Sequence, residues 1–510
     1  MRRLLVVVIA MIACSWLVSG ASDVVTVEGG QLHGTTAGGV RVFKGIPFAA
    51  PPVGALRWKA PQPVVAWSGV KAADTFAAQC MQQPYPAGSP YASAPQPTSE
   101  DCLYLNVWTA ARGNGRRPVM VWIHGGAWTR GSGSTPTYDG AALAKKGVVV
   151  VTTNYRLGAF GFFAHPELTK ESPTRASGNY GILDHVAALK WVQKNIEAFG
   201  GDPARVTIFG ESAGSWSVNV VQATPLAKGL FHRAIGESGG QFAGTTTLAE
   251  AERRGVAFGT AVGARTLADL RALPAEKLLG VESFRTSVNV DGYALPEDVR
   301  SIFARGKQTS VPVLVGSNAN EMTTLSNVAT FPTSMEEFRR QIAVRFPGFS
   351  EQFNVAYPVK TEADIPAALL AVGRDQTFTG EMRTWARMVT AAGQKAFLYQ
   401  FTHVPPSPNA KAWGAYHASE IAYVFGTLRN RDWPYAQTDF KLSDQMSSYW
   451  SNFAVAGDPN GKGLPAWTPY DQTDEPFLEL GDTIQTKHHL LKAQLDFLDD
   501  AALRRRSVSQ

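Results

Sequence analysis

A serine near the middle of the chain stands in a pattern that can turn its hydroxyl into a nucleophile. The β-branched, apolar run Val206-Thr-Ile-Phe-Gly-Glu-Ser-Ala-Gly-Ser215 ends in G-x-S-x-G around Ser212. This pattern is typical of a sharp turn from a strand into a helix, and a helix-compatible segment follows it here. The backbone N–H of Ala213 can then face the oxyanion of an acyl intermediate. The same pentapeptide also occurs in ordinary turns, so the rest of the chain must decide.

A second loop of small residues lies upstream, where further donors for an oxyanion are expected. The run Pro118-Val-Met-Val-Trp-Ile-His-Gly-Gly-Ala-Trp128 reads as an apolar strand that enters a turn. Because Gly125, Gly126 and Ala127 leave the backbone accessible, their N–H groups can approach a ligand. Two glycines after a strand often form only a turn, but two such loops in this order favour acyl chemistry.

A serine hydroxyl at neutral pH needs a base, and the base needs an acid that fixes its tautomer. We predict His417 as the base, because it lies in a small-residue loop that leads into an apolar stretch. The other histidines after Ser212 fit less well: His232, His403, His488 and His489. The strand-like run 311–321 ends in Glu321, at the end of a strand where ligands gather in open sheets. Glu321 is therefore the predicted acid, and Glu420 and Asp184 are the alternatives.

The order of apolar and helical segments predicts one large α/β domain. Strands are expected near residues 118–123, 147–153, 205–210, 311–316 and 396–401, with helical stretches such as 182–198 between them. This alternation predicts a mostly parallel sheet covered by helices on both faces. Because the candidate residues spread over most of the chain, a single domain at 22–510 must contain them. Only the segment 84–97 and the basic tail at 504–506 look irregular.

The first 21 residues have the features of a cleavable secretion signal. Arg2 and Arg3 form a basic start, residues 4–13 are an apolar run too short for a membrane span, and Ser19-Gly-Ala21 offers small residues for cleavage. Lipoprotein processing at Cys14 is the alternative. We expect a secreted or periplasmic protein without stable membrane insertion.

Charge and cysteine content exclude several classes of function. The formal net charge of +6, which falls to +4 without Arg2 and Arg3, comes without a basic stripe and does not indicate nucleic-acid binding. Outside the leader, Cys80 and Cys102 form an even pair suited to an oxidising compartment. No histidine lies near them in the sequence, so we expect no metal site, and we expect no cofactor.

Several further segments together resemble the type B carboxylesterase family, which also includes cholinesterases, some fungal lipases and the noncatalytic neuroligins. The segments that carry the resemblance are Phe43–Gly54, Ser99–Trp108, His124–Ala127, Gly178–Asp184, Gly201–Ser215, the strand ending at Glu321, the loop of His417, and Asn452–Asn460. The resemblance covers the chain from about residue 23 to about residue 480. The resemblance implies the α/β-hydrolase fold, with a large, mostly parallel central sheet, helices on both faces and long insertions.

Carried over by position, the resemblance also implies a site. Its parts are Ser212 as nucleophile, His417 as base, Glu321 as acid, and Gly126, Ala127 and Ala213 as backbone donors. The resemblance further implies that the Ser238 hydroxyl lies near these residues and that Cys80 pairs with Cys102. Glu211 and Glu420 flank catalytic positions and are expected to hold loops by hydrogen bonds, without a part in the chemistry.

The implied function is hydrolysis of small-molecule carboxylic esters through an acyl-enzyme, on small to medium, bulky or polycarboxylate substrates. The loop 81–101 lacks the tryptophan that binds choline in cholinesterases, and it is short and rich in Pro, Ser and Ala, unlike a lipase lid. Four aromatic residues either line the pocket or pack in the core: Trp128, Trp216, Phe242 and Trp413. Arg130 meets a substrate carboxylate if it points into the cleft, and is otherwise solvated. The alternative is a noncatalytic adhesion or scaffold protein, and the oligomeric state is left open.

Overall fold

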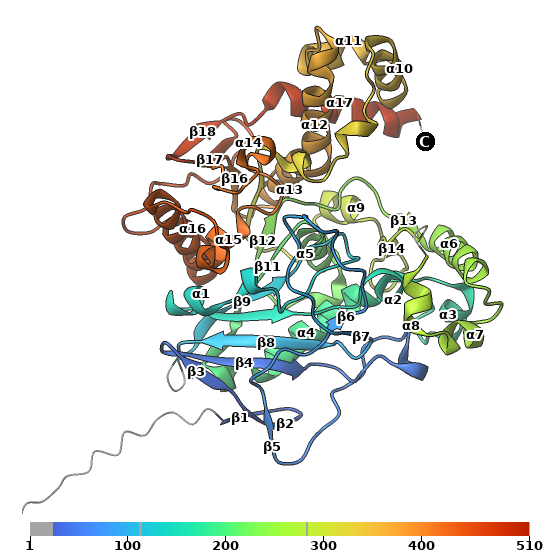
Figure 1. Cartoon of the computed structure of the whole chain (residues 1–510), viewed down its shortest axis with the longest axis vertical. Coiled ribbons are helices and arrows are strands. Elements are labelled where there is room, and N and C mark those ends of the chain that lie inside the picture. The colour runs from blue at the N-terminus through green and yellow to red at the C-terminus, as the bar shows by residue number, and fades with distance from the viewer. Residues whose placement is uncertain (1–23, 112–114, 282–283, 509–510) are drawn as a thin grey trace, which may run out of the picture.

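The computed structural model describes residues 24–111, 115–281 and 284–508 (Figure 1). The predicted leader at 1–21 lies outside the described residues. The described chain is built around an 11-stranded sheet. In sheet order the strands are β18 (Ile484–His488), β17 (Pro476–Leu480), β16 (Ala396–Phe401), β15 (Val313–Asn318), β12 (Arg233–Glu237), β11 (Gly201–Glu211), β9 (Arg117–Ile123), β10 (Val149–Thr153), β8 (Tyr104–Thr109), β4 (Val40–Pro47) and β3 (Thr35–Ala37).

The middle of this sheet is parallel and its edges are antiparallel. Strands β17, β16, β15, β12, β11, β9 and β10 pair in parallel, each with the next. At the edges β18, β8, β4 and β3 pair antiparallel with their neighbours. The prediction of a mostly parallel central sheet is confirmed.

Both faces of the sheet are covered by apolar side chains. In β9, Val119, Val121 and Ile123 pack into one buried cluster, whereas Met120 and Trp122 pack into another. The split follows from the two-residue period of a strand, which sends successive side chains to opposite faces. Because both faces are buried, the strand reads as a continuous apolar run in the sequence.

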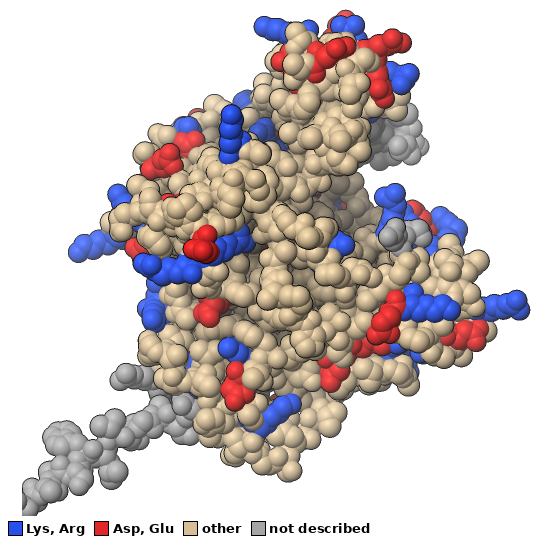
Figure 2. All heavy atoms as spheres, in the orientation of Figure 1, with Lys and Arg blue, Asp and Glu red and all other residues tan. Residues whose placement is uncertain are grey.

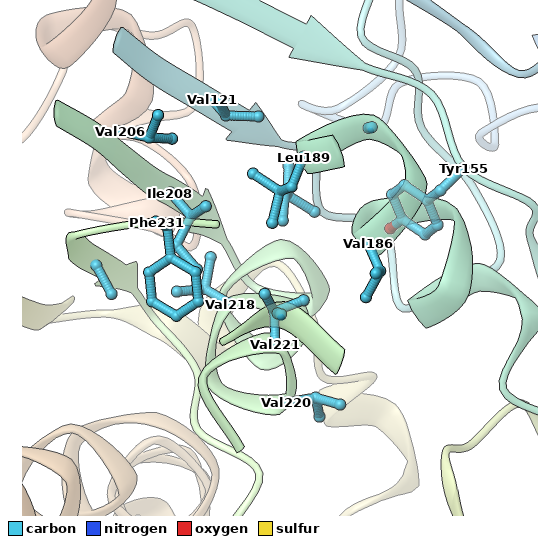
Figure 3. Close-up of a cluster of buried hydrophobic side chains, with 14 of the residues drawn as sticks. Val121, Tyr155, Val186, Leu189, Val206, Ile208, Val218, Val220, Val221 and Phe231 are labelled. Atoms are coloured by element: carbon cyan, nitrogen blue, oxygen red, sulfur yellow. The ribbon is translucent and has the colours of Figure 1, made fainter. Parts of the chain in front are cut away.

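Helices close the two faces. Those used below are α4 (Tyr180–Asn195), α5 (Ala213–Ala223), α6 (Leu248–Ala261), α10 (Met335–Arg345), α11 (Ser350–Ala356), α15 (Ile421–Phe425), α16 (Gln437–Ala456) and α17 (Lys492–Val508). Figure 3 shows Leu189 of α4 and Val218 of α5 among the buried side chains near Ile208 of β11. On the other face Trp450 of α16 packs in the second cluster. The predicted helix at 182–198 corresponds to α4 and the 3-10 turn that continues it to Phe199.

A helical lobe lies at the top of Figure 1 and has its own apolar cluster. Phe338 of α10, Phe353 of α11 and Phe497 of α17 pack together there. Residues 504–506, expected to be an irregular tail, belong to the last turns of α17, so that prediction was wrong. The physical reason is that Ala, Leu and Arg are good helix formers and continue a helix that is already docked on the lobe.

The distribution of charge on the surface is relevant to nucleic-acid binding, and the length and apolar content of the helices are relevant to membrane insertion. On the face shown in Figure 2, acidic and basic side chains are intermixed and lie mainly around the edge. In the part of the chain that the structure describes, no helix is both long and apolar enough to cross a bilayer.

Candidate active site

Ser212 lies between β11 and α5, where the chain turns sharply. Its φ of +56° and ψ of −123° are rare for a residue with a side chain. Gly214 makes the turn possible, because a Cβ there would lie 2.0 Å from the carbonyl oxygen of Ile123. Ser212 is largely buried and lines a cavity. The G-x-S-x-G pattern therefore forms the strained strand-to-helix turn.

The loop after β9 is bent by residues with positive φ. Gly126 has a φ of +103° and Ala127 a φ of +55°. The Gly126 carbonyl accepts hydrogen bonds from the N–H groups of Thr129 at 2.9 Å and Arg130 at 3.0 Å. These bonds fix the orientation of the peptide that joins Gly126 to Ala127.

This loop lies against the serine. A Cβ on Gly125 would lie 3.1 Å from Cβ of Ser212. Among the N–H groups of the loop and the turn that make no hydrogen bond within the described residues are those of Gly126, Ala127 and Ala213. These three backbone donors are therefore unpaired.

His417 and Glu321 come from two loops at the same edge of the sheet. His417 Nδ1 lies 2.6 Å from Oε2 of Glu321, and Oε1 of Glu321 accepts a hydrogen bond of 2.7 Å from the N–H of Asn318. Both side chains are buried. Asn320 ties the loops together, because its N–H donates to the carbonyl of Ala415 and its side chain accepts from the N–H of Ala415, both at 3.0 Å.

The second ring nitrogen of His417 faces a carboxyl group that the sequence interpretation kept apart from the chemistry. Nε2 lies 3.1 Å from Oε1 of Glu211, although the two atoms are not aligned as a hydrogen bond. No hydrogen bond joins His417 to Ser212 in the described chain. Burial, and then the charges of Glu321 and Glu237, raise the pKa of Glu211 well above its usual range. Burial therefore disfavours a negative charge on Glu211 beside the imidazole.

Two more buried carboxyl groups lie close by. Glu237 Oε1 accepts a 2.7 Å hydrogen bond from Trp450, and burial raises the pKa of Glu237 to about 8. Glu420 accepts a 2.5 Å hydrogen bond from the side chain of Asn318, and burial followed by the charge of Glu211 raises its pKa well above the usual range. The hydrogen bond of Glu420 joins the His417 loop to the end of β15. Glu420 was expected to hold loops by hydrogen bonds, and this contact is of that kind.

The sequence carried a signal for this cluster that was not used. Glu211 and Glu237 are the last residues of β11 and β12, and the two strands pair them in register. Glu321 follows the next parallel strand, β15. Carboxylates at the ends of neighbouring parallel strands meet at one edge of the sheet.

Ser238 follows Glu237 and is fully buried, with a φ of +56°. Its N–H donates to the carbonyl of Gly316 at 2.7 Å, and its hydroxyl has no partner in the described chain. Because Glu237 pairs with Glu211, Ser238 lies one strand away from Ser212 at the same level.

A cavity of about 1370 Å³ opens onto Ser212 and His417. The four candidate aromatic residues divide between this cavity and the core. Trp216 and Trp413 line the cavity, whereas Trp128 and Phe242 are buried in the core cluster beneath the sheet.

The remaining wall of the cavity comes from the loop that the Cys80–Cys102 disulfide closes. The segment 84–97 in this loop has no helix or strand, as predicted. The Tyr91 hydroxyl shares a 2.6 Å hydrogen bond with that of Thr324, and the Tyr91 ring meets His417 edge-on at 6.2 Å. The disulfide loop therefore reaches the imidazole.

A serine on a turn after a central parallel strand, with a histidine–glutamate pair at the same edge of the sheet, defines an α/β-hydrolase. The model of the carboxylesterase family matches residues 21–498. Fumonisin B1 esterase of Sphingopyxis macrogoltabida is 39% identical, over 88% of this chain and 84% of its own. Liver carboxylesterase 1F of Rattus norvegicus is 36% identical (92% and 90%), and carboxylesterase 5A of Canis lupus familiaris is 35% identical (90% and 85%). The chain belongs to the carboxylesterase family, and its activity is that of a carboxylesterase.

Proposed function

We propose that the chain is a secreted serine ester hydrolase that forms an acyl-enzyme on Ser212. The observation that carries the proposal is the position of Ser212 on a strained turn with unpaired backbone donors, lining the same cavity as the ring of His417. That ring is itself held by Glu321 at 2.6 Å. A nucleophile, a base and a group that orients the base are the parts that acyl transfer requires.

In the proposed reaction, Ser212 Oγ attacks the ester carbonyl carbon while His417 Nε2 takes the hydroxyl proton. The oxyanion that forms accepts hydrogen bonds from the three unpaired N–H groups of Gly126, Ala127 and Ala213. The bond to the alcohol then breaks, and His417 returns the proton to the leaving oxygen. Water, activated by the same imidazole, attacks the acyl-enzyme and releases the acid.

The free enzyme needs one adjustment before this reaction. His417 Nε2 lies beside Oε1 of Glu211, at 3.1 Å, and must bond to Ser212 in the reactive complex. Catalytic hydrogen bonds that are long or misaligned in the free enzyme commonly form only with substrate bound. Ser238, whose buried hydroxyl has no partner in the described chain, is proposed to support this edge of the site.

The proposed substrates are small to medium esters, including bulky and polycarboxylate ones. A cavity of about 1370 Å³ leaves room for a large acyl or alcohol group. One relative carries the name fumonisin B1 esterase and another the name liver carboxylesterase, and both names support an ester as the substrate.

Export and domain organisation are also proposals. The apolar leader at 1–21 and the Cys80–Cys102 disulfide support a secreted or periplasmic location, because disulfides persist in oxidising compartments. The strands that carry the site span residues 117–401 and share one sheet, which supports a single catalytic domain at 22–510.

The test is turnover of 4-nitrophenyl butyrate by the full chain and by Ser212→Ala. Loss of the hydroxyl removes the covalent step and leaves only binding and oxyanion stabilisation, so turnover should fall to near background while thermal unfolding is unchanged. The matched control is Ser217→Ala in α5, where the lost hydroxyl accepts a 2.8 Å hydrogen bond from Trp128, and turnover should be retained. Near-normal turnover by folded Ser212→Ala would contradict the proposal and favour a noncatalytic role for this serine.

A further inference from the structure

The cavity beside Ser212 contains a guanidinium group with unused donors. Arg130 lines the cavity, and its Nε donates to the carbonyl of Gln83 at 3.2 Å. Within the described residues, its two terminal nitrogens make no hydrogen bond or ion pair. A guanidinium carries five N–H donors in a fixed plane, so most of them remain available.

The other arginine of the cavity is already used by the protein. Arg431 donates to the hydroxyl of Tyr416 at 3.0 Å and to the carbonyl of Pro90 at 3.3 Å. These bonds hold the His417 loop to the disulfide loop. Arg431 is therefore a structural contact, in contrast to Arg130.

Arg130 is held against the loop of Gly126 and against Tyr85. Its backbone N–H donates to the carbonyl of Gly126 at 3.0 Å, and its guanidinium lies 5.7 Å from the centre of the Tyr85 ring. The hydroxyl of Tyr85 lies 2.9 Å from the place that a Cβ on Gly126 would occupy. The Tyr85 hydroxyl thus lies against the oxyanion loop, and the guanidinium of Arg130 lies over the ring of the same tyrosine.

The disulfide loop fixes this arrangement from the other side. Gln82 and Gly131 form a reciprocal pair, in which the Gln82 amide donates to the carbonyl of Gly131 and accepts from its N–H, both at 2.8 Å. Gly131 follows Arg130, and Gln82 stands two residues after Cys80. A side chain whose backbone is held on both sides loses little freedom when a ligand binds.

The charges of the cavity favour an anion. Glu211 is the only carboxylic residue among those that line it in the described chain, and burial raises its pKa well above the usual range. The arginines of the lining are Arg130 and Arg431. A negatively charged group near Arg130 therefore meets two guanidinium groups in the cavity wall and one carboxyl group, Glu211, whose charged form is disfavoured by burial.

We propose that Arg130 selects esters that carry a carboxylate several bonds away from the scissile carbonyl, by binding that carboxylate with its two terminal nitrogens. Planar guanidinium and carboxylate groups match in a two-point pair, which a neutral ester cannot make. The carboxylate belongs either to the acyl part, as in a half-ester of a dicarboxylic acid, or to the alcohol part. The inference rests on the proposed function, because the same bound ester must meet Ser212.

The experiment compares charged and neutral esters of equal shape. In the acyl arm, where the carboxylate is on the acyl part, kcat/KM is measured for mono-4-nitrophenyl adipate and for its methyl ester. In the alcohol arm, where the carboxylate is on the alcohol part, kcat/KM is measured for 3-acetoxybenzoate and for its methyl ester. In Arg130→Gln the charged-to-neutral ratio should fall about 10- to 100-fold in at least one arm, as expected for a charged hydrogen-bonded pair. Arg130→Lys should keep part of the preference, because it keeps the charge and loses the planar fork.

Arg429→Gln is the matched control. Arg429 is exposed, lies close to Arg431 in the chain and does not line the cavity. Its substitution by Gln removes the same positive charge from the molecule as Arg130→Gln, but outside the cavity. Its ratio should equal that of the wild type. Added salt should lower the ratio of the wild type and leave that of Arg130→Gln unchanged, since ions screen a partly exposed pair.

An unchanged ratio in Arg130→Gln in both arms would overturn the proposal, as would an equal fall in Arg429→Gln. If Arg130→Gln does not fold, the proposal is tested by measuring how strongly adipate inhibits the wild type. Adipate should compete with the neutral ester more strongly than uncharged adipamide, and equal inhibition would overturn the proposal. Failure of the proposed function would be seen separately, as turnover of a neutral ester by Ser212→Ala, which does not depend on Arg130.

Discussion

Gly214→Ala tests whether the nucleophile turn and the oxyanion loop pack as the structure describes. A Cβ on Gly214 would lie 2.0 Å from the carbonyl oxygen of Ile123, 2.9 Å from its carbonyl carbon and 3.0 Å from the carbonyl carbon of His124. All three are backbone atoms at the end of β9, directly before Gly125. Because real Cβ atoms essentially never come within 3.0 Å of such atoms, the turn and the strand must separate by about 1 Å.

The expected cost follows from that displacement. A misplacement of about 1 Å in a catalytic site costs on the order of 100-fold in rate, and overpacking of a filled core costs about 1–3 kcal/mol of stability. Gly214→Ala should therefore lower kcat for 4-nitrophenyl butyrate about 100-fold. KM should change little, because Trp413 and the disulfide loop, which also line the cavity, belong neither to the turn nor to the end of β9.

The assay is steady-state hydrolysis of the butyrate ester together with thermal unfolding followed by circular dichroism. Gly259→Ala in α6 is the control, because its nearest neighbour would lie at an ordinary 3.5 Å. It should keep full activity and unfold at the same or a higher temperature. Wild-type kcat and unfolding temperature in Gly214→Ala would refute the described packing.

Three further predictions concern the acid, the buried histidine and the disulfide. Glu321→Gln removes the charge that favours the imidazolium of His417 and should lower kcat by roughly 10³- to 10⁴-fold with little change in KM; near-normal turnover would assign the acid elsewhere. Burial, and then the neighbouring His124, lower the pKa of His185 from 6.5 to about 3, so the unfolded chain takes up a proton in that window and the folded chain does not. The free energy of unfolding should therefore fall with decreasing pH below about 6.5, by about 1.4 kcal/mol per pH unit from this residue. When the free energy of unfolding is measured with urea at several pH values, it should depend less steeply on pH in His185→Gln than in the wild type. An equal dependence on pH in the two proteins would contradict the assignment. Reduction of Cys80–Cys102 should lower stability by about 3 kcal/mol in the chain-entropy model, and full stability with both thiols titrated as free would contradict a structural role.

The strands and the nucleophile turn were predictable because local patterns determine them. The apolar run at 118–123 gives β9 at Arg117–Ile123, since a buried strand must be apolar on both faces. The turn at Ser212 was equally predictable, because G-x-S-x-G encodes close backbone contacts that exclude larger residues. The pairing of His417 with Glu321 at 2.6 Å was a prediction from chain order and resemblance, and only the structure supplies the distance.

Contacts that depend on side-chain direction were not predictable. Whether Trp216 lines the cavity and Trp128 packs in the core depends on which side of a helix or loop each ring leaves. The approach of Glu211 to His417 at 3.1 Å depends on how far the His417 loop extends beyond the end of β11, which no spacing in the sequence reports. The helical end of α17 was missed because its docking on the lobe is a long-range contact.

Covalent labelling of the serines tests whether Ser212 is the residue that becomes acylated. The full chain is treated with diethyl 4-nitrophenyl phosphate, which transfers a phosphoryl group to an activated serine, and is then digested with trypsin. Cleavage after Arg205 and Lys228 releases a peptide with three candidate serines: Ser212, Ser215 and Ser217. We expect one phosphoryl group per chain, and fragmentation of the tryptic peptide should locate it on Ser212. Activity should fall in proportion to the extent of labelling. Inactivation with the label on another residue, or full labelling of Ser212 with activity retained, would contradict the assignment of Ser212 as the nucleophile.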